Sequence, residues 1–105
     1  MAKIHTIKND RIEFPVFASA RVFTLFQAKH KLSVFEFIQA HPHNMEGYAD
    51  ALYYGYKSAC KLEEKEEKYS TEDFLDFLDM NELVEGVAKM LGIAWGGTSQ
   101  DDKKK

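Results

Sequence analysis

The sequence predicts a mainly α-helical fold, with about four to five short helices in one domain and a small β-hairpin at the N-terminus. Alternation of residue type with period two is confined to about residues 4–17. Apolar residues recur every three or four positions over most of the remaining chain, and Ser or Asp stands at three helix-start positions. Because 105 residues suffice for one core, we expect a single domain over 1–95 and a flexible tail over 96–105.

The hairpin is predicted by residues 4–17, where residue types alternate on both sides of Asn9-Asp10. Asn and Asp both tolerate the left-handed backbone of a tight hairpin turn, so we place the turn at this pair. Pro15 lacks an N–H, and the second strand should therefore lie at an edge or end near that residue.

Two helices are predicted between the hairpin and Pro42. From Ala18 to His30 the apolar residues cover more than one helical face, which indicates a buried helix. Ser33 followed by Glu36 is a capping-box pattern and predicts a helix over residues 34–40. The segment from 32 to 38 is also β-prone, so a strand is the rival interpretation.

The clearest helix begins near Asn44 and has one apolar stripe, whose members are Met45, Tyr48, Ala49, Leu52, Tyr53, Tyr56, Ala59 and Cys60. The charged run over 61–68 should be a solvated end. Ser70 is expected to cap a short acidic helix, and Asp79 with Glu82 to open a last helix that ends at Gly92. Beyond it, Gly96-Gly97 and the polar residues that follow indicate the flexible tail.

Charge is unevenly distributed along the chain, although the net charge is only −3. Residues 1–31 carry six basic and two acidic side chains, a net +4, whereas residues 61–86 carry three basic and ten acidic ones, a net −7. This polarity favours head-to-tail association of like copies. The other interpretation, a solvated acidic surface that only aids solubility, stays equally open.

Residue types that carry catalysis or bind metal do not form a recognisable pattern. His5, His30, His41 and His43 lack zinc-ligand spacing, and the one cysteine, Cys60, lies within an apolar stripe as a small core residue. The carboxylates fall on predicted exposed faces, and no phosphate-binding glycine loop occurs. We therefore expect a protein that is not an enzyme and takes no cofactor or metal.

Composition also limits the partners and the compartment. The apolar runs are too short to cross a bilayer, and a single cysteine with no apolar stretch in 1–15 favours the cytoplasm. Basic residues near aromatic rings in the N-terminal third are the one argument for nucleic acid, and no recognition motif accompanies them. A small regulatory nucleic-acid-binding or adaptor protein is kept as the alternative function.

Aromatic residues make up 13% of the chain, and several fall outside the predicted apolar stripes. Tyr54 lies off the main stripe of its helix, Phe35 and Phe37 point to different faces, and Trp95 follows the last helix. We expect these four to be exposed anchors for partner binding or self-association. The alternative, that a small domain places rings on several sides of its short helices, carries equal weight.

The order of elements resembles the tail assembly chaperones of long-tailed bacteriophages. The similar segments are the strand-turn-strand Ile4–Phe14, the apolar helix Phe17–Phe26, the segment Leu52-Tyr-Tyr-Gly55, the capped acidic helix Tyr69–Asp79 and the final helix Asn81–Leu91. The chain departs from the family at Asn9-Asp10, where a glycine is common, and in its long charged run 61–68.

The resemblance implies a function without catalysis. Such proteins coat the long helical tape measure protein and help to recruit the tail tube protein during virion morphogenesis, in the host bacterial cytoplasm. Because many copies must cover one amphipathic rod, the resemblance also implies a homo-oligomer, with a spiral as one arrangement.

Overall fold

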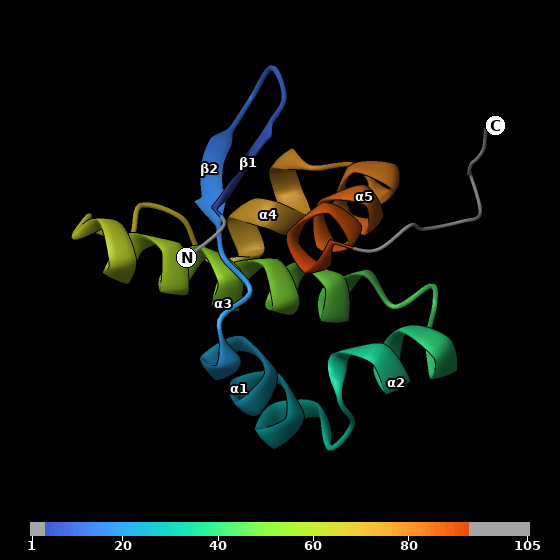
Figure 1. Ribbon diagram of the computed structural model, residues 1–105. Coiled ribbons are helices and arrows are strands. Elements are labelled where there is room, and N and C mark those ends of the chain that lie inside the picture. The colour runs from blue at the N-terminus through green and yellow to red at the C-terminus, as the bar shows by residue number, and fades with distance from the viewer. Residues whose placement is uncertain (1–3, 93–105) are drawn as a thin grey trace, which may run out of the picture.

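The computed structural model describes residues 4–92, and within them it is mainly helical with a two-stranded N-terminal hairpin, as predicted (Figure 1). The predicted tail over 96–105 lies outside the described residues. The long helix α3 crosses the molecule. The hairpin, α4 and α5 lie on one side of it, and α1 and α2 lie on the other (Figure 1). The elements are β1 (His5–Lys8), β2 (Glu13–Val16), α1 (Ala20–His30), α2 (Val34–Ala40), α3 (Met45–Glu63), α4 (Thr71–Phe77) and α5 (Met80–Leu91).

The hairpin pairs antiparallel, with Ile7 opposite Phe14 and Thr6 opposite Pro15. The expected left-handed turn at Asn9-Asp10 is wrong, because Lys31 and Glu64 are the non-glycine residues of positive φ in the described chain. Four residues connect the strands instead. The side-chain oxygen of Asn9 accepts hydrogen bonds from the backbone N–H groups of Arg11 and Ile12, which closes the turn without a left-handed residue.

Helix α1 is a surface helix, which corrects the expectation of a buried one. Val22 and Phe26, four residues apart, are its buried residues and face α3, while Thr24 and Gln27 are exposed. Residues 34–40 form helix α2 and not the rival strand. The Ser33 side chain accepts from the N–H of Glu36, whose carboxylate accepts from the N–H of Ser33, so the capping box is confirmed.

The remaining helices begin where their capping residues predict, but α3 ends at Glu63, so most of the charged run 61–68 lies beyond the helix. Asn44 caps α3, Ser70 with Asp73 forms a capping box at α4, and Asp79 with Glu82 forms one at α5. Gly92 ends α5 with a φ of 73°, a conformation that glycine adopts without strain. No helix formed by residues 4–92 is both long and apolar enough to span a membrane.

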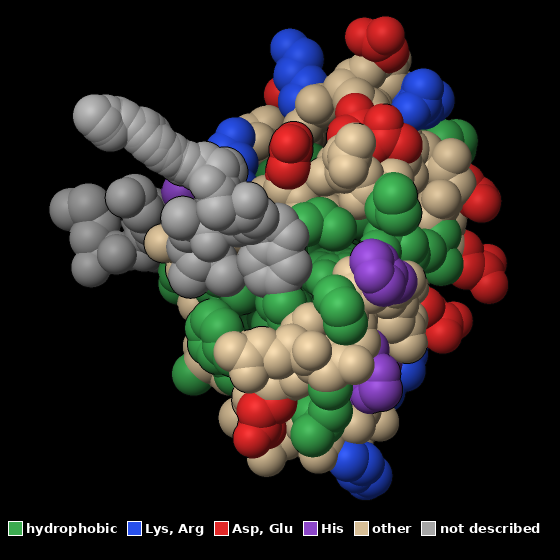
Figure 2. Space-filling view, turned by 90° about the vertical axis from the view of Figure 1, so that its right-hand side faces the viewer, with side chains coloured by type: hydrophobic (Ala, Val, Ile, Leu, Met, Phe, Trp, Pro, Cys, Tyr) green, Lys and Arg blue, Asp and Glu red, His purple; other side chains and the backbone are tan. Residues whose placement is uncertain are grey.

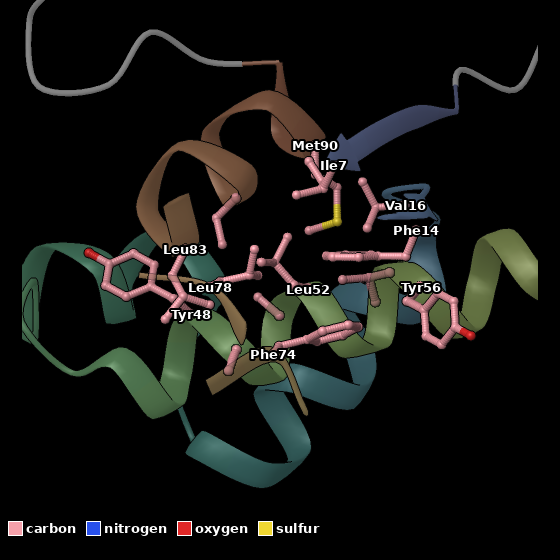
Figure 3. Close-up of a cluster of buried hydrophobic side chains, with 14 of the residues drawn as sticks. Ile7, Phe14, Val16, Tyr48, Leu52, Tyr56, Phe74, Leu78, Leu83 and Met90 are labelled. Carbon is pink, nitrogen blue, oxygen red and sulfur yellow. The ribbon is translucent and has the colours of Figure 1, made fainter. Parts of the chain in front are cut away.

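The core extends over both sides of α3 and includes buried residues of α1 and α2. Figure 3 shows the part of it where the hairpin, α4 and α5 meet α3. Phe14 stacks on Phe74 with ring centroids 4.3 Å apart. Gly55 of α3 lets two neighbours approach closely: its carbonyl accepts from the Phe17 N–H, and a Cβ there would lie 2.2 Å from the Met90 sulfur. The aromatic-small segment of α3 therefore serves the packing of this core.

Candidate functional site

Two aromatic side chains form a stacked pair on the surface between α1 and α2. The rings of Phe23 and Phe35 have centroids 6.0 Å apart and an interplanar angle of 17°. Phe35 is 47% exposed, and Phe23 is half-buried against the core. The sequence predicted Phe35 as an exposed anchor, whereas Phe23 was assigned to a buried helix. We call these two residues the aromatic pair.

Phe37 is buried, which corrects its assignment as an exposed anchor. Its side chain is 5% exposed, and its ring packs against Phe26 at 5.3 Å and His30 at 4.8 Å. A Cβ on Gly47 would fall 2.1 Å from this ring, so the ring lies directly on α3. Residues two apart in a helix point about 200° apart. Exposure of Phe35 therefore turns Phe37 into the core.

Tyr54 is half-buried on α3 and lines an open groove of about 770 Å³ between α1 and the C-terminal half of α3. Burial raises the pKa of its hydroxyl, and the nearby Asp50 carboxylate adds to this rise. The fourth predicted anchor, Trp95, lies outside the described residues. We call the groove the basic groove; it is lined by Arg21, Leu25, Tyr54, Lys57, Ser58, Cys60, Lys61, Lys65, Glu66 and Glu67.

The basic groove gathers positive charge from two distant segments of the chain. Arg21 of α1 faces Lys57 and Lys61 of α3 across it, and Lys65 follows at its end. Tyr54, Lys57 and Lys61 share a face because they are three and four residues apart. The run 61–68, which is acidic overall, therefore contributes basic side chains here, together with Glu66 and Glu67.

A second charged surface lies at the turn between α4 and α5. Phe77 is 38% and Met80 57% exposed, and the acidic side chains of Glu72 and Asp76, four residues apart on α4, are also exposed. We call these four residues the acidic corner. Figure 2 looks onto the side where α2 and α5 lie, and shows apolar side chains in the centre of that face with acidic ones along its margin.

Asp50 is the one buried charged residue in the described chain, and sequence reasoning missed it. Its side chain is 3% exposed, and its Oδ2 atom lies 2.9 Å from both Lys29 Nζ and His30 Nε2. The hydrogen bond to Asp50 raises the pKa of Lys29. An acidic residue between Ala49 and Ala51, at the edge of an apolar stripe, was the available signal. Because Lys29 and His30 of α1 both contact its carboxylate, we interpret Asp50 as a structural tie.

The remaining candidates for chemistry are accounted for by packing or exposure. Cys60 is 3% exposed, as expected of a core residue, and burial raises the pKa of its thiol. His41 and His43 are exposed in the connection between α2 and α3. Within residues 4–92, no three His, Cys, Asp or Glu side chains gather in a way that would hold a metal ion.

Comparison of the chain with protein-family models, with curated proteins and with solved structures finds no match.

Proposed function

We propose that this chain is a non-enzymatic tail assembly chaperone of a long-tailed bacteriophage, which binds and coats the tape measure protein and helps to recruit the tail tube protein. The single observation that carries this proposal is the aromatic pair, Phe23 and Phe35, stacked on the surface between two short helices. The resemblance in element order supplies the family.

An exposed aromatic pair suits the binding of an amphipathic helix. Rings bury a large apolar area with few side-chain torsions to immobilise, and such residues dominate the energy of protein interfaces. Phe23 and Phe35 come from different helices, so their position depends on the folded domain. A client that presents repeated apolar stripes, as a long helical rod does, offers this surface the same contact many times.

Coating a rod requires many copies, and the charge polarity of the chain supports this part of the proposal. Each copy binds the rod weakly through a small surface, while contacts between neighbouring copies raise the effective concentration of the next copy. We place this assembly, a homo-oligomer with a spiral as its simplest form, in the bacterial cytoplasm of the host.

The proposal is tested by co-expression with the tape measure protein of the phage or prophage that encodes the chain. We expect the wild-type chain to keep that protein soluble and to be captured with it. Phe23→Ser with Phe35→Ser should abolish capture, because the apolar contact is removed. The matched control is Leu62→Ser, which changes a residue of similar exposure, 49%, outside the aromatic pair. Equal capture by all three chains would contradict the proposal.

One observation favours the alternative, a regulatory nucleic-acid-binding protein. The basic groove places Arg21, Lys57 and Lys61 beside the ring of Tyr54, and a ring on a positive surface is a feature of single-strand binding. Glu66 and Glu67 line the same groove and oppose phosphate. A gel shift with single- and double-stranded probes at low and high salt decides: salt-sensitive binding would support the alternative.

A further inference from the structure

The basic groove and the acidic corner are separate surfaces that share no residue. The groove is lined by residues of α1 and of the C-terminal half of α3. The corner belongs to α4 and the start of α5, which lie on the side of α3 opposite to α1 (Figure 1). Two different surfaces placed this way can join copies head to tail, because each copy keeps one surface of each kind free for the next copy.

The net charges of these two surfaces are opposite, because four basic side chains outnumber Glu66 and Glu67 in the groove, whereas the corner carries Glu72 and Asp76. Among residues 4–92, Arg21 and Lys61 of the groove have no ion-pair partner, whereas Lys57 pairs with Glu67 and Lys65 with Glu63. Glu72 and Asp76 of the corner likewise have none in the described chain, whereas Asp73 is held in the cap of α4. These four charged side chains are therefore not neutralised by a partner within the described residues and can pair with another molecule.

The apolar parts of the two surfaces are also complementary. The groove has Leu25 and the half-buried Tyr54 among its lining residues, and the corner presents Phe77 and Met80 as projecting side chains. Interfaces gain most of their energy from such apolar anchors in partly desolvated hollows, while charges around them set orientation and partner choice. Arg11 is the basic residue at the corner, and its Nε atom donates to the Phe77 carbonyl.

We propose that the acidic corner of one copy docks into the basic groove of a second copy. The contact is heterologous, so repetition builds an open chain or a ring of copies. This inference rests on the proposed function for its purpose, because it supplies the contact between neighbouring copies on a rod. It is nevertheless tested on the pure chain, without any client.

The test uses two charge-reversal variants, Lys61→Glu in the groove and Asp76→Lys in the corner. Size-exclusion chromatography with light scattering, over concentrations up to the solubility limit, should show association of the wild type that weakens as salt rises. Each variant alone should associate about tenfold more weakly or worse, because its two surfaces then carry less opposite charge. Equimolar mixing should restore association, because each reversed surface then meets its complement.

The matched controls are Lys31→Glu and Glu46→Lys, which make the same changes of charge at exposed residues outside both surfaces. They should associate as the wild type does, and circular dichroism should show all four variants folded. A wild type that stays monomeric at every concentration would overturn the proposal. So would variants that associate normally, or a mixture that stays as weak as its components.

The outcome separates this proposal from the proposed function. If a monomeric wild type still captures the tape measure protein, the docking model fails and the chaperone function stands. If Lys61→Glu loses capture while the pure wild type is monomeric, the groove holds a client segment and the second copy is excluded as its occupant. If association follows the charge swap and no client is captured, the docking contact stands and the chaperone function fails.

Discussion

The imidazole of His30 lies 2.9 Å from the buried carboxylate of Asp50, and this contact joins α1 to α3 inside the domain. The ring of His30 also packs on Phe26 with centroids 4.3 Å apart, and Lys29 donates to the same carboxylate oxygen. A charge that is nearly inaccessible to water is thereby satisfied by two partners on one helix. The contact helps to hold α1 against α3, and these two helices form the walls of the basic groove.

Replacing Asp50 should destabilise the protein. In Asp50→Ala the His30 ring loses its acceptor in a largely dry site, and we expect the free energy of unfolding to fall by about 2–3 kcal/mol. Lys29→Met is the comparison, with an expected loss below about 1 kcal/mol because the Lys29 side chain is 55% exposed. Urea denaturation at neutral pH measures both. Equal losses would show that the tie is a surface ion pair.

Stability should fall at alkaline pH because burial raises the pKa of several protonated groups. These are the hydroxyls of Tyr48, Tyr53, Tyr54 and Tyr56 and the thiol of Cys60. A folded state that holds its protons more tightly than the unfolded chain is favoured fully below the unfolded pKa, and loses this advantage as pH rises. The free energy of unfolding should begin to fall near pH 9.0, the ordinary pKa of the thiol, and fall faster above pH 10.0.

The variant Cys60→Ala separates the thiol from the tyrosines in this pH dependence. Its unfolding free energy should stay flat to higher pH than that of the wild type, since the first titrating group is gone. Tyrosinate absorbance, followed in parallel, should rise together with unfolding. An unfolding free energy that increases between pH 9.0 and 10.0 would contradict the assigned direction of the pKa shifts.

Two glycines of α3 should respond differently to the same substitution. In Gly47→Ala the new Cβ meets the stiff ring of Phe37 at 2.1 Å, and we expect a loss of about 1–3 kcal/mol. In Gly55→Ala the Cβ meets the flexible end of Met90 at 2.2 Å, which can move, and alanine favours the helix by about 1 kcal/mol. Thermal denaturation should rank Gly55→Ala as the more stable variant, and adding Phe37→Leu should recover part of the loss in Gly47→Ala alone.

Asn9 should couple the hairpin turn to the start of α5. Its Nδ2 atom donates to the Phe77 carbonyl at 2.8 Å and to the Glu82 carboxylate at 3.0 Å, and its oxygen closes the turn. Asn9→Asp keeps that acceptor, but it removes the donor and places a negative charge beside Glu82, so we expect a loss of about 1–2 kcal/mol. Glu82→Gln in the same chain should relieve part of it. Purely additive losses in the double-mutant cycle would refute the coupling.

The two phenylalanines of α2 should separate stability from binding. Phe37→Ala empties a core position and should cost about 3–5 kcal/mol. Phe35→Ala removes a half-exposed ring and should cost about 1 kcal/mol or less, while it weakens any interaction made through the aromatic pair. Denaturation curves of the two variants test the first part. A large loss from Phe35→Ala would mean that its ring supports the fold more than a partner.

Local signals in the sequence predicted most of the elements. The capping pairs Ser33/Glu36 and Asp79/Glu82 determine helix starts, because they satisfy backbone donors within three residues of themselves. The sequence predicts the position of the turn at Asn9 correctly but its backbone conformation wrongly. Hydrogen bonds to the Asn9 side chain close the turn, so no residue there needs a left-handed conformation. The residue type alone does not distinguish the two kinds of turn, because Asn is common in both.

The candidate surfaces were less predictable, because each depends on contacts between distant segments. Periodicity showed that Phe35 and Phe37 face different ways, yet only the packing of α2 on Gly47 decides which of them is buried. The basic groove joins Arg21 to Lys57 and Lys61, which lie far apart in the sequence. Counting charges by segment therefore assigned the positive surface to residues 1–31 alone and missed the contribution of Lys57 and Lys61.

By itself, the sequence determined that this protein is one mainly helical domain with an N-terminal hairpin, because period, capping and turn chemistry are local properties of the chain. Only the tertiary structure decided which aromatic rings are exposed and which charges lie side by side. Burial of Asp50 and of Phe37 depends on how α1 and α2 pack against α3, and the net free energy of that packing is a sum over side chains from distant segments. The exposed surfaces consist of the side chains that this packing leaves uncovered, and they are therefore defined only in the folded protein.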